Sequence, residues 1–92
     1  MITIESINQN SFKVTVNKES TTEHLVLLND NFYQSITIGK ITKKDLIIKS
    51  FEFLLLRESN QSILKEFNLE VINQYFPEYN NEIKKLSYNK KS

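Results

Sequence analysis

The chain has 92 residues, and its 12 basic and 11 acidic side chains give a formal net charge of +1. A chain of this length builds one domain with one core, and buries roughly 60–65% of its extended surface on folding. The small net charge argues against the strong field that gathers nucleic acid or anionic lipid. The sequence contains no cysteine, which excludes disulfides, thiolate metal sites and thiol nucleophiles.

Membrane and secretion signals are missing from the sequence. No apolar stretch approaches the roughly 18 residues of a membrane-spanning helix. The residues after Met1 do not form the basic and apolar regions of a secretory signal. We therefore expect a cytoplasmic protein that has no membrane partner.

The first 28 residues carry a period of two that predicts β-strands. Phe12, Val14 and Val16 alternate with polar neighbours, and Ile2 and Ile4 follow the same rule. The polar stretches 8–10 and 17–21 suit turns, and the sequence HLVLL at 24–28 supplies a strand that is apolar on both faces. The sequence predicts an antiparallel β-meander of about three strands over residues 1–28.

Residues 29–41 predict a short helix and a turn. Phe32, Tyr33 and Ile36 recur at helical spacing behind Asp30, which we expect to cap the helix. The single glycine, Gly39, marks the turn that follows. A fourth strand over residues 30–38 is the alternative.

The clearest helix start in the chain lies at Thr42. This residue suits the N-cap, Asp45 follows three residues later, and Ile41 is placed to pack on Leu46. The pattern predicts a central helix within residues 42–58 that ends at about Arg57.

The central helix carries more apolar surface than one neighbouring element can cover. Asp45, Lys49 and Glu52 fall on a narrow polar stripe. A helix that lies on a sheet needs an apolar stripe of about 100°, and the apolar arc here is about twice as wide. The apolar residues of the arc are Leu46, Ile47, Ile48, Phe51, Phe53, Leu54 and Leu55. We therefore expect the sheet on one side of this helix and the C-terminal segments on the other.

Residues 59–88 predict two to three short helices. Ser59 or Asn60 suits the cap of a helix that runs through Phe67, and Asn68 suits the cap of the next one. Pro77 is well placed as the first residue of a last helix.

The predicted fold is a single α+β domain of residues 1–92. A small antiparallel meander is packed by a central helix, and the short C-terminal helices cover the other side of that helix. Residues 89–92 are expected to form a flexible tail.

The residue pattern gives little support to catalysis or metal binding. His24 is the only histidine, and no carboxylate stands at metal-ligand spacing from it, so a structural or surface role is expected. With one glycine in the chain, phosphate-binding loops of the usual form are excluded, and no serine lies in a glycine-flanked nucleophile turn. We expect no enzyme activity, no catalytic residue, no cofactor and no metal.

The surplus of apolar residues predicts a small accessory or regulatory domain that binds another protein. An apolar patch beyond what one small core absorbs tends to become an interface. The partner is a protein of unknown identity or a second copy of the chain, and an isologous homodimer is the simplest such use. The candidate interface residues are Phe53, Leu56, Tyr75, Phe76 and Tyr79.

Nucleic-acid binding is the alternative function, through the C-terminal helices and their lysines. The stretch ILKEFNLEVINQYF has the outline of a helix-turn-helix. However, Leu64 and Gln74 stand where that motif wants a small and an aliphatic residue, and the second helix has no basic side chain. The candidate phosphate contacts are Lys84, Lys85, Lys90 and Lys91. Lysines near a C-terminus more often keep a chain soluble, so protein binding is the preferred interpretation.

Residues 50–79, SFEFLLLRESNQSILKEFNLEVINQYFPEY, are similar to the C-terminal signature of a family of small uncharacterised bacterial proteins. In that signature a phenylalanine-leucine helix precedes an Arg-Glu pair, the pattern SILxxFxLxxIxxYFPEY and a final helix. A looser similarity spans residues 22–83. The resemblance implies a stand-alone bacterial domain. No activity is attached to the family, so the resemblance assigns no site residues.

Overall fold

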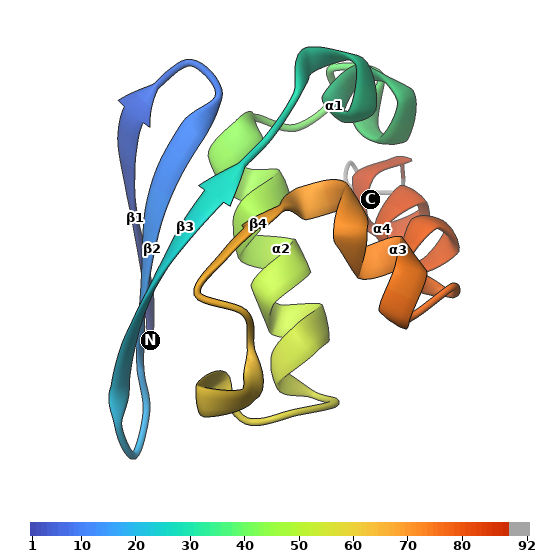
Figure 1. The fold of residues 1–92 in the computed structure, drawn as a ribbon. Coiled ribbons are helices and arrows are strands. Elements are labelled where there is room, and N and C mark those ends of the chain that lie inside the picture. The colour runs from blue at the N-terminus through green and yellow to red at the C-terminus, as the bar shows by residue number, and fades with distance from the viewer. Residues whose placement is uncertain (89–92) are drawn as a thin grey trace.

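The computed structural model describes residues 1–88 and has an α+β fold. Four strands form one sheet in the order β1-β2-β3-β4, and the helices lie together on one side of it (Figure 1). The predicted fold class is confirmed. The tail expected at residues 89–92 lies outside the described residues.

The N-terminal meander forms as predicted, from three antiparallel strands. These strands are β1 (Ile2–Asn8), β2 (Ser11–Asn17) and β3 (Thr21–Leu27). Val14 and Val26 are fully buried on the face that packs under the helices, whereas Lys13 and Glu23 are exposed on the other face. The period of two in the sequence is thus the signature of a sheet that is covered on one face only.

The predicted short helix is α1 (Asp30–Thr37), but its cap is a different residue. Asn29 has extended backbone geometry, and its side chain accepts a hydrogen bond from the Phe32 amide at 2.8 Å. Asp30 is instead the first helical residue, and its carboxylate lies 2.7 Å from Lys43 Nζ. The alternative of a strand over residues 30–38 is therefore wrong, as is Asp30 as the cap.

The central helix is α2 (Lys43–Leu55), and it begins as predicted. Thr42 Oγ1 accepts a hydrogen bond from the amide of Asp45 at 3.0 Å. The helix ends short of the predicted Arg57, because the Arg57 amide bonds the carbonyl of Leu54 at 2.9 Å. This shorter-range bond tightens the last turn, and the amide of Glu58 shares the same Leu54 carbonyl at 2.9 Å.

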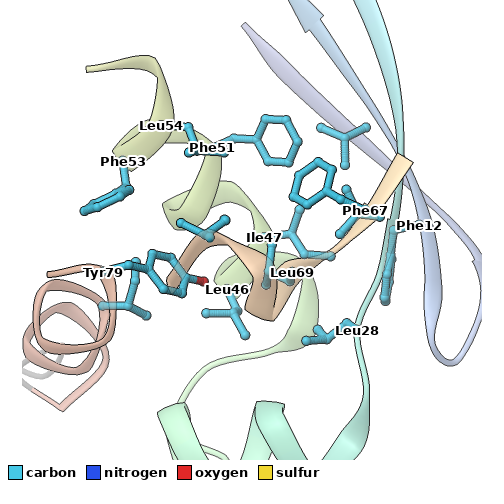
Figure 2. Close-up of a cluster of buried hydrophobic side chains, with 14 of the residues drawn as sticks. Phe12, Leu28, Leu46, Ile47, Phe51, Phe53, Leu54, Phe67, Leu69 and Tyr79 are labelled. Atoms are coloured by element: carbon cyan, nitrogen blue, oxygen red, sulfur yellow. The ribbon is translucent and has the colours of Figure 1, made fainter. Parts of the chain in front are cut away.

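Helix α2 is the middle layer between the sheet and the C-terminal helices (Figure 1). The ring of Phe51 faces the strands, with its centroid 6.1 Å from that of Phe67. The ring of Phe53 faces the opposite side, with its centroid 5.3 Å from that of Tyr79 (Figure 2). The predicted arrangement, in which the wide apolar arc is covered from two sides, is confirmed.

The segment after α2 differs from the prediction of a helix through Phe67. It contains a short 3-10 turn, η1 (Asn60–Ser62), and then a fourth strand, β4 (Glu66–Asn68), which pairs parallel with β3. The side chain of Asn60 is drawn inward by tertiary contacts, and its amide donates to the Ser20 carbonyl at 3.1 Å. This residue therefore joins the loop to the sheet and does not cap a helix.

The rest of the chain is helical. Another 3-10 turn, η2 (Leu69–Val71), continues into α3 (Ile72–Tyr75), and α4 (Tyr79–Tyr88) follows. Pro77 lies in the turn before α4, so its prediction as the first residue of that helix is wrong. Because a strand and not a helix precedes η2, the helix-turn-helix outline is also wrong.

Candidate protein-interaction groove

An apolar groove opens at the C-terminal end of α2, where the loop around η1, β4 and α3 come together. Its cavity measures about 220 Å³. The side chains that matter most in its lining are Leu54, Ile63, Leu64, Phe67, Tyr75 and Phe76. We call this surface the α3 groove.

The floor of the α3 groove belongs to the core, and its rim is open to solvent. Ile63, Phe67 and Ile72 are buried and also belong to the core cluster. Leu64 and Tyr75 line the same groove but keep 46% and 64% of their surface exposed. The groove therefore has a fixed base and two large apolar side chains that no part of the described chain covers.

Buried polar contacts hold one wall of the groove in place. His24 Nδ1 lies 2.7 Å from the carbonyl oxygen of Leu64, and Nε2 lies 2.9 Å from Thr22 Oγ1. The same Thr22 oxygen accepts a hydrogen bond from the Asn60 side-chain amide at 3.1 Å. A neutral imidazole with its hydrogen on Nδ1 satisfies all three groups, because Thr22 then donates to Nε2. A structural or surface role was predicted for His24, and its burial and contacts favour the structural one.

Three of the five predicted interface residues lie at or near the surface. Tyr75 and Phe76 line the α3 groove. Leu56 is 85% exposed, just beyond the end of α2, but it is not part of the groove lining.

Phe53 and Tyr79 are wrong as surface anchors, because they are 6% and 0% exposed. The guanidinium of Arg57 lies 3.6 Å from the centre of the Phe53 ring and shields it from solvent. Tyr79 lies at the start of α4, and the fold packs it inward against α2. Both side chains hold the helical layers together and are not available to a partner.

Tyr79 also makes a buried hydrogen bond to the central helix. Its hydroxyl lies 2.6 Å from Ser50 Oγ, and Ser50 donates its own hydrogen to the carbonyl of Leu46 at 2.7 Å. Tyr79 is therefore the donor in the bond to Ser50. Burial raises the pKa of the Tyr79 phenol well above its usual value, and the Ser50 contact opposes this only in part.

The charge in the groove is acidic. Among its described lining residues Glu58 is the one carboxylate, and no lysine or arginine lines it. Of the lysines predicted as phosphate contacts, Lys84 and Lys85 lie on α4 and are not part of the groove lining. Lys90 and Lys91 lie outside the described residues.

Sequence reasoning missed most of the groove residues. The helix predicted to run through Phe67 includes Ile63 and Leu64, and this prediction placed none of the three in a groove. The useful signal was the concentration of apolar residues at 62–64 (SIL) and 75–79 (YFPEY). These stretches follow the central helix, which already had an excess of apolar residues.

Metal-ligating side chains do not cluster within residues 1–88: no three of His, Asp or Glu lie close enough together to hold an ion. None of the helices in this part of the chain has the length and the apolar character needed to cross a bilayer.

Comparison of the chain with protein-family models, with curated proteins and with solved structures found no match. The resemblance to the bacterial family stays a prediction.

Proposed function

We propose that the protein is a cytosolic, non-catalytic interaction domain, and that the α3 groove binds a short segment of a partner protein. The observation that carries this proposal is an apolar recess with a buried floor, whose rim, Leu64 and Tyr75, stays exposed. Aromatic and aliphatic side chains around a pocket are typical of the centres of protein interfaces.

The size of the groove favours a protein segment over a metabolite. Pockets for small organic ligands usually measure about 300–1,000 Å³, and the groove measures about 220 Å³. An apolar cavity of about 150 Å³ is enough to hold a benzene ring. The α3 groove therefore has room for one or two bulky apolar side chains, which a helix or an extended peptide can supply.

The charge of the groove narrows the chemistry of the partner. Glu58 lies beside the apolar lining, and a basic residue next to the inserted side chain would pair with it. We therefore infer a partner segment that carries a leucine, phenylalanine or tryptophan close to a lysine or arginine.

Two other occupants fit the groove less well. An isologous dimer centred on the groove would set one hollow against another and leave both unfilled near the axis. Nucleic acid would meet the carboxylate of Glu58, whereas phosphate binding needs lysine and arginine.

The test is selection of a displayed library of random peptides against the wild-type protein, followed by affinity measurement with fluorescent copies of the enriched peptides. We expect the enriched sequences to share a bulky apolar residue near a basic one. Leu64→Glu should weaken their binding at least about tenfold, because it places a charge on the apolar rim. Glu58→Gln should weaken binding less and reduce its dependence on salt.

Leu56→Glu is the matched control for this experiment, because it is the same change at an exposed leucine outside the groove lining. The affinity of the Leu56→Glu variant for the enriched peptides should stay within about twofold of the wild-type value. An equal loss in both leucine variants, or a library that yields no common apolar and basic pattern, would contradict the proposal.

A further inference from the structure

The outer edge of the sheet is a second surface without a partner. β1 is the end strand, and no element of the described chain lies beyond it (Figure 1). Proteins usually protect such an edge with proline, lysine or a bulge. Between Ile2 and Ser6 there is no proline or lysine, and the irregularity in the pairing begins only after Ser6. The opposite edge, β4, is protected by its length of three residues.

The pairing of β1 with β2 decides which backbone groups of β1 are free. The amide of Asn17 bonds the carbonyl of Met1 at 2.8 Å, and these residues stand directly opposite in the register that pairs Ile2 with Val16. Bonded and non-bonded pairs alternate along an antiparallel ladder. The N–H and C=O groups of Ile2, Ile4 and Ser6 therefore point away from β2, toward the open edge.

The free groups are arranged symmetrically around Ile4. If two copies of β1 pair antiparallel with Ile4 opposite Ile4, then Ile2 of each copy meets Ser6 of the other. All the outward groups are then used, in about six hydrogen bonds. Thr3 lies opposite Glu5 in this register, so no like charges face each other.

The neighbouring registers are poorer. If the centre of the pairing moves one residue toward the C-terminus, Glu5 lies opposite Glu5 of the other copy, and the two like charges repel each other. A shift toward the N-terminus places Thr3 opposite Thr3 and leaves the outward groups of Ser6 without a partner. Shifts by a single residue would turn the covered face of one sheet to the solvent side of the other.

An apolar hollow lies next to the same edge, between β1 and α2. It measures about 350 Å³, and Ile2, Ile48 and Leu55 contribute its apolar lining. These three side chains are half-buried. Its charged side chains are Lys18 and Glu52, one of each sign, and Met1, which carries the N-terminal ammonium, also lines it.

We propose that the protein forms an isologous dimer through β1, in which two four-stranded sheets join into one continuous sheet with Ile4 on the two-fold axis. The occupant of the edge is a second copy of this chain, because the free hydrogen-bonding groups and the residues opposite them are self-complementary. The same axis brings the two hollows beside each other and covers Ile48 and Leu55 of both copies. The dimer leaves the α3 groove open, since that groove lies on the far side of α2 from β1.

Sedimentation equilibrium of the wild type from about 1 µM to 1 mM should show a reversible monomer–dimer transition. Ser6→Pro removes an outward N–H that β2 does not use, so the meander stays intact while the dimer loses two bonds. We expect the dimer dissociation constant to rise at least about tenfold. Ser6→Ala is the matched control, because both changes lose the hydroxyl contact with the Asn8 carbonyl but only proline lacks the N–H.

The register is tested with single cysteines, which is straightforward because the chain has none of its own. Ile4→Cys should give a disulfide-linked dimer on mild oxidation, since opposite residues of a bonded pair have Cα atoms about 5.5 Å apart, within the usual disulfide range. Thr3→Cys and Glu5→Cys report the neighbouring registers and should cross-link more slowly.

Three outcomes would overturn the proposal. The first is a wild type that stays monomeric at about 1 mM. The second is equal dimer affinity in the folded Ser6→Pro and Ser6→Ala variants, with folding checked by circular dichroism. The third is cross-linking that is fastest at Thr3→Cys or Glu5→Cys.

Discussion

The two sides of α2 are held by different physical means. On the sheet side, Phe51 packs between the rings of His24 and Phe67, at centroid distances of 5.4 and 6.1 Å. On the helical side, the rings of Phe53 and Tyr79 pack together, and the Tyr79 hydroxyl forms a buried hydrogen bond with Ser50. Apolar burial is strong but has no direction, whereas a buried hydrogen bond is satisfied in one position only. We therefore expect the hydrogen bond between Tyr79 and Ser50 to fix the position of α4 on α2.

This difference matters for the α3 groove, which opens where the two sides meet. Phe67 of the sheet side and Phe76 of the helical side both line it. A change on either side of α2 can therefore be measured twice, as a change in the free energy of unfolding and as a change in peptide affinity.

The largest expected effect comes from removing one aromatic ring on each side. Phe51→Ala should lower the free energy of unfolding by about 4–5 kcal/mol, because a fully buried ring leaves a cavity. Phe53→Ala should cost about 3 kcal/mol, because this ring lies near the surface and is covered in part by the side chain of Arg57. Urea unfolding of both variants measures the difference, and equal losses would show that the two aromatic rings contribute equally to stability.

A smaller effect tests the hydrogen bond of the helical side. Tyr79→Phe should cost about 1 kcal/mol near neutral pH, because it removes the donor to Ser50 while the ring stays in place. Tyr75→Phe is the matched control, since Tyr75 is exposed and its hydroxyl is free to bond water. A loss in the control that equals the loss in Tyr79→Phe would show that the buried bond has no special weight.

The pH dependence of the free energy of unfolding gives a second test of the helical side of α2, again with Tyr79→Phe. Burial raises the pKa of Tyr79, so the unfolded chain loses this proton first, at its ordinary pKa of about 10. The contribution of Tyr79 to stability is complete below that pH and is lost as the pH rises toward its folded pKa. Above about pH 10 the wild type should lose up to about 1.4 kcal/mol per pH unit more than Tyr79→Phe. Parallel curves for the two proteins, from unfolding at several alkaline pH values, would contradict the burial of the phenol.

The smallest effect concerns the outer rim of the helical side. Arg57 stacks on Phe53 and donates to its backbone carbonyl at 3.0 Å, and it also pairs with Glu78 at 3.2 Å. Arg57→Gln should cost about 1 kcal/mol, since it loses the stacked cation and a charged donor. Glu78→Gln keeps the stacking and should cost less than Arg57→Gln, because an exposed ion pair contributes little. Thermal unfolding of both variants checks the order, and a larger loss in Glu78→Gln would show that the ion pair dominates.

Local rules predicted the first half of the fold well, because its signals lie within short stretches of sequence. The alternation of Val14 and Val16 with polar neighbours identifies a strand that is buried on one face. Thr42 and Asp45 form a cap that depends on three residues of chain, and the structure contains it. The excess of apolar residues in α2 also predicted correctly that a third layer covers its second side.

The second half of the fold was harder to predict, because β4 is a strand only through its pairing with β3, which lies far away in the sequence. Its three residues contain one buried side chain, Phe67, a pattern that suits a helix as well as a strand. The contacts that hold it extended come from β3 and from Asn60, which reaches back to the sheet. No rule based on neighbouring residues includes such contacts.

The candidate site was found only in part for a similar reason. Tyr75 and Phe76 were identified as surface aromatics, and they line the groove. The helical pattern placed Phe53 in the apolar arc but could not show which element would cover it. Ser50, a hydroxyl inside an apolar arc, was the available sign that a polar partner such as Tyr79 packs there.

The parallel strand β4 also has a consequence for the order in which the chain gains its structure. β1 to β3 close through short turns, whereas β4 reaches β3 only after α1 and α2 have bridged the gap. Contacts between distant parts of a chain cost more loop entropy and tend to form late. We therefore expect β4 and the η1 loop to open more often than the meander, with faster exchange of their amide hydrogens. The wall of the α3 groove would then be the part of the molecule that opens first. A bound peptide would slow the amide hydrogen exchange of this wall and leave the exchange rates of the meander unchanged.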